Sequence, residues 1–196
     1  MAAECAEALR NACAFGSIDV ARTLCLSPRL QMYIDGASEE HGTALMAAAD
    51  AGRADSVQLL ISYGADVNAT DGLGRSALML AAAQGATELL APLLRGGIEP
   101  ADAFLKANNG WTALMFACAA GREETVDELL RLVGEGGADA LLALVEQKDN
   151  DGQTALEIAR VHGRVALLEA LTKALLVIED ERATRHMQPE TRIPFE

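Results

Sequence analysis

The sequence predicts an all-α solenoid of stacked helix pairs, and three observations lead to this prediction. Ala and Leu dominate the apolar residues while aromatic residues make up only 4% of the chain, a composition that favours closely packed helices over sheets. The 196 residues are enough to bury a substantial core. A motif in which glycine follows a hydroxyl residue by nine positions occurs four times, as is typical of repeat proteins.

The hydroxyl residue of each motif is predicted to be the N-cap of a first helix. These residues are Thr43, Ser76, Thr112 and Thr154, at spacings of 33, 36 and 42 residues. The side-chain oxygen accepts a hydrogen bond from a free amide at the helix start, and Glu157 has the spacing of a capping box with Thr154. The glycine then ends the helix where positive φ is needed. A degraded copy over residues 4–34, with Glu7 in place of the hydroxyl residue, is expected to cap the stack.

A second helix is predicted behind each glycine. Val57, Leu59 and Leu60, for example, are spaced to bury one helical face. Pro92 falls inside one of these runs and should shorten or kink that helix. The strings at 71–74, 108–110 and 149–152 are rich in Asn, Asp and Gly, which favours tight hairpins between units.

The last units are longer, and the chain is expected to close with one long helix. The extra residues lie around 98–105 and 134–147, where Ala138–Val145 could add a helical turn. Apolar residues from Arg164 onward predict the closing helix. The sequence therefore predicts one repeat domain over residues 1–182, with full repeats starting near 38, 71, 107 and 149, and a tail over 183–196 whose order stays open.

These motifs match a known repeat unit. Asp71 to Ser76 and Asp149 to Thr154 follow the pattern Asp-x-x-Gly-x-Thr/Ser, and residues 64–68 read Gly-Ala-Asp-Val-Asn. Over residues 6–172 the sequence resembles the ankyrin repeat. The resemblance implies about five helix pairs with hairpin-like turns, and a role in binding other proteins.

One departure from the ankyrin pattern recurs in the sequence. The usual Pro-Leu-His after the Thr is replaced by Ala-Leu-Met in three units, a variant similar to that of ankyrin proteins of parasitic protists. The loss of His removes a polar link beside the cap. Packing of the Met side chains is expected to take over that role.

Stacked repeats present hairpin tips and first-helix surfaces along one concave side, where the binding residues are predicted to lie. The predicted tip residues are Leu73, Arg75, Asn108, Asn109, Trp111, Asn150, Asp151 and Gln153. The predicted first-helix residues are Asp50, Gln84, Val161 and His162. Trp111 is the one tryptophan of the chain, so it is either an aromatic anchor for a partner or a structural residue that packs on its own hairpin.

The formal net charge of −13 bears on the choice of partner. An acidic surface repels phosphates, so we expect no nucleic-acid ligand. The longest apolar stretch is far below membrane-spanning length, so we expect no membrane insertion. The expected partner is another protein, with basic surfaces favoured by the acidic field, and the chain is expected to be a monomer. The four cysteines show no metal or disulfide spacing, and the N-terminus lacks a signal-peptide core. These features predict a cytoplasmic location.

No catalytic residue, cofactor or metal site is predicted. A calcium loop starting at Asp149 would place Arg160 at its twelfth position, where a bidentate Glu is required. The three histidines are far apart in the repeat register, so no nucleophile with a base is visible. The predicted function is a non-enzymatic interaction module or adaptor. A structural component of a cytoskeletal or membrane-skeleton assembly stays open as the alternative.

Overall fold

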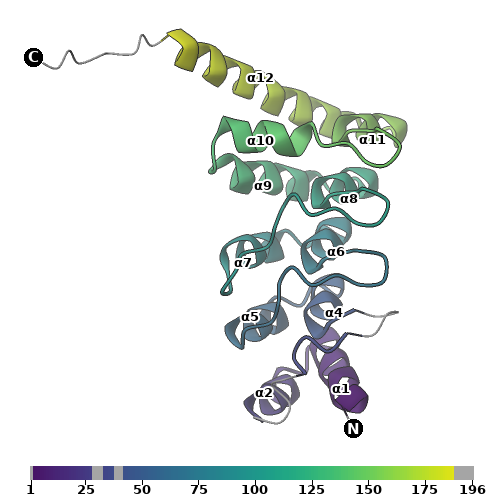
Figure 1. Cartoon of the computed structure of the whole chain (residues 1–196). Coiled ribbons are helices and arrows are strands. Elements are labelled where there is room, and N and C mark those ends of the chain that lie inside the picture. Colours follow the sequence, from purple (N-terminus) through teal and green to yellow (C-terminus); the bar gives the residue numbers. More distant parts are fainter. Residues whose placement is uncertain (1, 28–32, 38–41, 188–196) are drawn as a thin grey trace, which may run out of the picture.

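The helices of this computed structural model, which describes residues 2–27, 33–37 and 42–187, stack as two rows (Figure 1). The first helices form one row: α1 (Ala2–Ala14), α4 (Ala44–Asp50), α6 (Ala77–Gln84), α8 (Ala113–Ala120) and α11 (Ala155–Val161). The second row holds α2 (Ile18–Leu26), α5 (Ala54–Ser62), α7 (Leu90–Arg95), α9 (Glu123–Gly134) and α12 (Val165–Met187). No strand occurs within the described residues, so the prediction of an all-α solenoid is confirmed.

The caps form where the sequence predicts them. The hydroxyls of Thr43, Ser76, Thr112 and Thr154 each accept a hydrogen bond from the amide three residues later. Glu157 completes the predicted capping box by accepting from the Thr154 amide at 2.7 Å. In two other units a methionine sulfur takes this place, because Met46 Sδ and Met79 Sδ each lie 3.5 Å from the N-cap amide. The methionines therefore supply the missing polar link as well as packing.

Small residues allow the first helices to lie close together. Six of them are fully buried between neighbouring units: Ala48, Ala49, Ala81, Ala82, Ala117 and Cys118. Large side chains such as Leu60, Leu90 and Leu129 fill the space between the two rows. One continuous apolar core thus runs along the stack.

Two irregular segments have clear sequence causes. Pro92 shortens its helix as predicted, since the second helix of that unit is a 3₁₀ turn over Thr87–Leu89 followed by α7 of six residues. The long spacing before Thr154 provides an additional helix, α10 (Ala138–Val145), which packs on α9 and α12.

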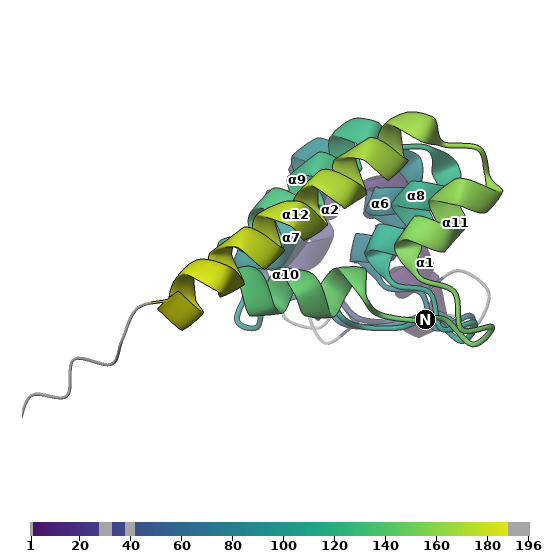
Figure 2. The same cartoon turned by 90° about the horizontal axis from the view of Figure 1, so that it is seen from above.

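The last helix extends past the predicted end of the repeat domain. Helix α12 continues to Met187 and projects past α10 (Figure 2). The predicted domain end at 182 therefore falls inside this helix. The predicted repeat start near 38 lies outside the described residues, as does the part of the predicted tail from 188 onward.

Arginines link neighbouring units where the first helices end. Arg53 Nε donates to the Ala14 carbonyl at 3.2 Å, and Arg122 Nε donates to the Ala83 carbonyl at 3.0 Å. Arg164 lies in the same way against Gly121 of the preceding unit. Ala86 occupies the equivalent position in the remaining unit, which interrupts the series. Each arginine places a cation at the negative end of a helix dipole.

Ala86→Arg is expected to extend this series toward the C-terminus of α4. The predicted gain in the free energy of unfolding is about 0.5 to 1 kcal/mol, because cations near helix C-termini stabilise by this amount. Urea denaturation measures it. Ala86→Met adds a side chain of similar length without charge and serves as the control, and a gain that is equal in both variants would contradict the electrostatic explanation.

Candidate functional site

Three hairpins carry the predicted tip residues, and they share one turn geometry. The amides of Asp71, Ala107 and Asp149 donate to the carbonyls of Arg75, Trp111 and Gln153 at 2.9 to 3.0 Å. Asp149 Oδ1 also accepts from the amides of Asp151 and Gln153. Asp71 and Asp149 therefore shape two of the three turns, as short polar side chains do elsewhere.

Asn108 and Asn150 join the hairpins into a ladder. Asn108 Nδ2 donates to the Gly72 carbonyl at 3.0 Å, and Asn150 Nδ2 donates to the Asn108 carbonyl at 2.8 Å. Their backbone amides donate to Leu73 and Asn109. Both residues were predicted to bind a partner, but each side-chain amide already holds the preceding tip.

Trp111 has structural contacts of its own. Its indole Nε1 donates to Asp149 Oδ2 at 3.1 Å, and its ring meets Phe116 edge-on with 5.2 Å between centroids. Its backbone amide donates to Asn109 Oδ1. These contacts favour a structural role for Trp111, because the ring is half-buried and its one donor is satisfied. The side chain does not pack on its own hairpin as that alternative supposed, since its partners are Asp149 of the next hairpin and Phe116 of α8.

Arg75 is held by a carboxylate of its own hairpin. Its Nε and one terminal nitrogen lie 2.8 and 2.7 Å from Asp71 Oδ2. Burial alone would raise the pKa of Asp71, but its hydrogen bonds and charge interaction with Arg75 outweigh burial and lower that pKa. The pair is therefore ionised at neutral pH.

The predicted first-helix residues fall into two groups. Gln84 Nε2 donates to Asp50 Oδ1 at 3.0 Å, so these two residues meet across α4 and α6. Val161 and His162 lie at the end of α11. The repeat that lies between the two groups has Ala119 and Ala120 of α8 at the equivalent positions. Val161 is 70% exposed. The structure thus brings Asp50 and Gln84 together but leaves Val161 and His162 apart from them.

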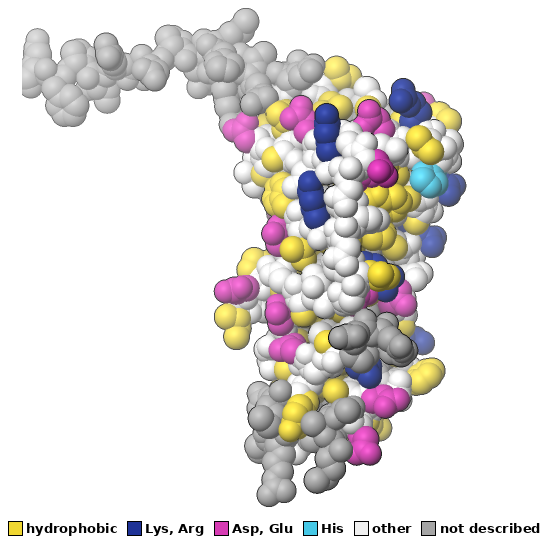
Figure 3. Space-filling model, turned by 45° about the vertical axis from the view of Figure 1, so that its right-hand side comes forward, with side chains coloured by type: hydrophobic (Ala, Val, Ile, Leu, Met, Phe, Trp, Pro, Cys, Tyr) yellow, Lys and Arg dark blue, Asp and Glu magenta, His cyan; other side chains and the backbone are white. Residues whose placement is uncertain are grey.

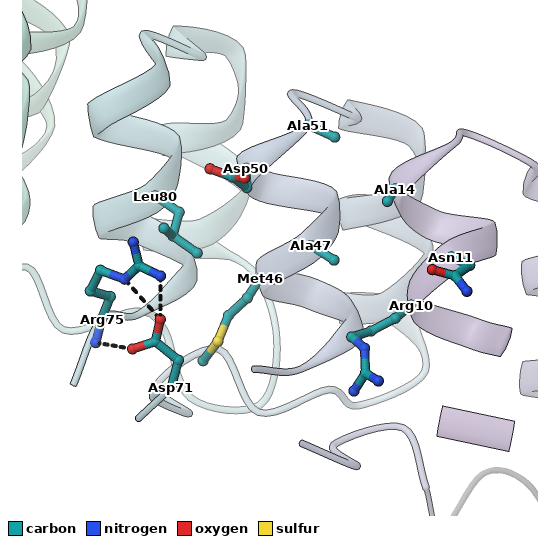
Figure 4. Close-up of a pocket in the computed structure, with 10 residues that line it drawn as sticks. All are labelled: Arg10, Asn11, Ala14, Met46, Ala47, Asp50, Ala51, Asp71, Arg75 and Leu80. Carbon is teal, nitrogen blue, oxygen red and sulfur yellow. Dashed lines mark hydrogen bonds and ion pairs between the residues drawn. The ribbon is translucent and has the colours of Figure 1, made fainter. Parts of the chain in front are cut away.

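A hollow of about 340 Å³ lies where the first helices and the first hairpin tip converge. Asp50 and Arg75 line it together with Arg10, Asn11, Leu80 and neighbouring residues (Figure 4). Arg10 and Asn11 come from α1, and Leu80 from α6. Sequence reasoning missed these three residues. The repeat register could have found two of them, because Asn11 and Leu80 both stand four positions after the cap position, where Ala47 also lines the hollow.

The same face carries mixed chemistry. Apolar side chains gather in its upper part, and basic side chains follow its right-hand edge (Figure 3). Leu73 is an exposed apolar residue on the tips, with 59% of its surface accessible. Protein interfaces combine an apolar centre with a polar rim, and this face offers both kinds of side chain.

The thiols of Cys13 and Cys118 are buried in the described part of the chain. Burial raises the pKa of the Cys13 and Cys118 thiols to about 12, so both are protonated at neutral pH. Among the described residues, no three His, Cys, Asp or Glu side chains gather as metal ligands. No described helix has both the length and the apolar character needed to cross a bilayer.

Comparison with known proteins identifies the architecture. The model of the family described as ankyrin repeats (3 copies) matches residues 3–71 and 78–180. The chain belongs to the ankyrin-repeat family. Ankyrin repeats are general protein–protein interaction modules, and the family is typically non-enzymatic.

Three relatives of this chain are longer than the chain itself. The mitochondrial disaggregase of Bos taurus is 31% identical over 78% of this chain, which spans 26% of that protein. Neurogenic locus notch homolog protein 2 of Homo sapiens is 32% identical over 74% of this chain, and ankyrin repeat domain-containing protein 63 of Homo sapiens is 30% identical over 80%. The chain spans 5% and 40% of these two proteins. The similarity therefore concerns the repeat domain and not the whole relatives.

Proposed function

We propose that this ankyrin-repeat chain is a non-enzymatic adaptor in the cytoplasm, which binds a partner protein on its concave face. The observation that supports this proposal most directly is the hollow between α1, α4, α6 and the first hairpin tip. It brings Asp50 and Arg75, two residues from different structural elements, to one surface. Preformed helices supply the shape, so little ordering is needed on binding.

The residues that remain available on this face define the docking surface more narrowly than the twelve predicted ones. Asn108, Asn150 and Trp111 hold the hairpins together, so we assign them a structural role and not a role in partner binding. Leu73 and Val161 present apolar side chains to solvent, and Asp50 and Gln84 are exposed as a hydrogen-bonded pair. The chain's net charge of −13 favours a partner with a basic contact surface.

Leu73→Asp combined with Asp50→Lys is expected to weaken partner capture about tenfold, because the double change removes an apolar contact and reverses a charge at the proposed surface. Capture from native extract at two salt concentrations, followed by quantitative mass spectrometry, measures the loss. Val20→Asp changes an exposed apolar residue on α2, in the other row of helices, and is the matched control. Unchanged capture by the double variant, with helical circular dichroism equal to the parent, would refute the assigned face.

A further inference from the structure

Three extra residues lie in the segment between α7 and the next hairpin. In the preceding unit the Ala65 amide donates to the Leu60 carbonyl, and here the Ala101 amide donates to the Leu93 carbonyl. Leu60 and Leu93 are 33 residues apart, whereas Ala65 and Ala101 are 36 apart. The insertion therefore falls within residues 94–100, and the chain resumes the repeat register at Ala101.

The inserted loop has a defined conformation. A Cβ on Gly96 would lie 2.3 Å from the Pro92 carbonyl oxygen, and Gly97 has a φ of +82°. At the far end Asn68 Nδ2 donates to the Pro100 carbonyl at 3.1 Å, and the Asp102 amide donates to Asn68 Oδ1 at 2.7 Å. Glycine geometry at one end and side-chain hydrogen bonds at the other thus hold the loop in place.

This loop presents an isoleucine to solvent. Ile98 is 91% exposed, whereas Ala65, Val67, Ala101 and Ala103 around the loop are buried. A large apolar side chain held outward on an ordered loop gains nothing from the core. Loops that a rigid scaffold positions commonly carry binding residues.

Ile98 borders an apolar cleft of about 600 Å³ between α5 and α7. Ile61 and Tyr63 line one side of it, and Pro92 with Gly96 and Gly97 lines the other. The loop after α7 lies at the opposite side of the stack from the first helices α4 and α6 (Figure 1). This cleft is therefore separate from the concave face proposed above.

Exposed carboxylates stand close in sequence to residues that line the cleft. In the sequence, Asp66 stands two positions after the lining residue Gly64, and Glu99 directly follows the lining residue Ile98. Asp102 lies on the next turn, and all three residues are exposed. Asp35 Oδ1 accepts from the Asp66 amide at 2.8 Å and adds a fourth carboxylate. Burial, and the charge of Asp66, raise the pKa of Asp35. Within the described part of the chain, no ion pair joins a Lys or Arg to these residues.

We propose that this cleft is a second docking site, and that its occupant is a segment of another protein with an apolar side chain flanked by Lys or Arg. The apolar side chain would fill the space between Ile98 and Ile61, and the cations would pair with the exposed carboxylates of the adjoining turns. Another copy of this chain suits the site poorly, because each copy carries a net charge of −13. Anionic lipid is repelled for the same reason.

Selection from a random dodecapeptide phage library on the purified chain tests this proposal. The enriched peptides are expected to share an apolar residue with Lys or Arg within two positions. Ile98→Asp is expected to weaken binding of the synthesised peptides at least about tenfold, as loss of an interface anchor does. Asp66→Asn with Glu99→Gln and Asp102→Asn is expected to weaken it about fivefold and to remove most of its salt dependence.

The controls separate this site from the concave face. Leu73→Asp, which lies on a hairpin tip, should leave binding of these peptides unchanged, and circular dichroism should be equal for all variants. Failure to enrich any peptide, enrichment of acidic peptides, or equal binding by Ile98→Asp would overturn the proposal. Self-association of the parent in sedimentation that Ile98→Asp abolishes would also overturn it, because it would assign the cleft to a second copy.

Discussion

Gly110→Ala is expected to destabilise the chain far more than Gly152→Ala, although both glycines hold the same place in a hairpin. Both have positive φ, at 85° and 78°, so each alanine costs roughly 1 to 2 kcal/mol in backbone strain. A Cβ on Gly110 would also lie 2.6 Å from the Asn150 amide nitrogen and 2.9 Å from the Asp149 carbonyl carbon. A Cβ on Gly152 meets nothing within 4 Å.

The difference reflects stacking of one hairpin tip on the next. Relief of the contact at Gly110 requires the tips to separate, which would also lengthen the hydrogen bond from Asn150 Nδ2 to the Asn108 carbonyl. Overpacking of this kind adds about 1 to 3 kcal/mol to the strain. Urea titrations of the two variants give their free energies of unfolding, which are then compared. The dependence of this free energy on urea concentration should be the same in both variants if unfolding is two-state. Equal losses would show that the tips do not constrain one another.

The sequence was sufficient to predict the helix pairs because their signals are local. A hydroxyl cap and a glycine nine residues later define each first helix within one unit, and no distant contact is needed. Thr154 with Glu157 and the shortened helix at Pro92 formed as expected for the same reason.

Contacts between units were harder to predict. Asn108 and Asn150 look like free polar residues at exposed tips, yet their amides are used by the preceding hairpin. That partner stands 36 or 42 residues away in sequence and becomes a neighbour only when the repeats stack. The hollow includes Arg10 from the degraded first unit, where the weak motif gave no reason to look for a binding residue. The structure was therefore needed to decide whether a tip residue stabilises the repeat stack or is free to contact a partner.

Asp149→Ala is expected to lower the free energy of unfolding by about 2 to 3 kcal/mol, since loss of hydrogen bonds to a charged acceptor costs this much. Its carboxylate shapes its own turn through the amides of Asp151 and Gln153 and holds the Trp111 indole of the preceding hairpin. The substitution leaves the indole donor without its partner. Because the chain has one tryptophan, its emission reports this site alone and should shift to longer wavelength.

Two further variants separate the turn from the link between hairpins. Asp151→Ala removes the exposed carboxylate two residues away, for which the structure gives no side-chain hydrogen bond within the described residues, and should change neither stability nor emission. Asp149→Asn can keep an oxygen toward the turn amides but sets an NH₂ group against the indole N–H of Trp111. The free energy of unfolding should fall by about 1 kcal/mol, as expected for the loss of one hydrogen bond. The tryptophan emission should still shift to longer wavelength. An unshifted spectrum in Asp149→Asn would mean that the indole does not depend on this carboxylate, and Trp111 would again be a candidate for partner contact.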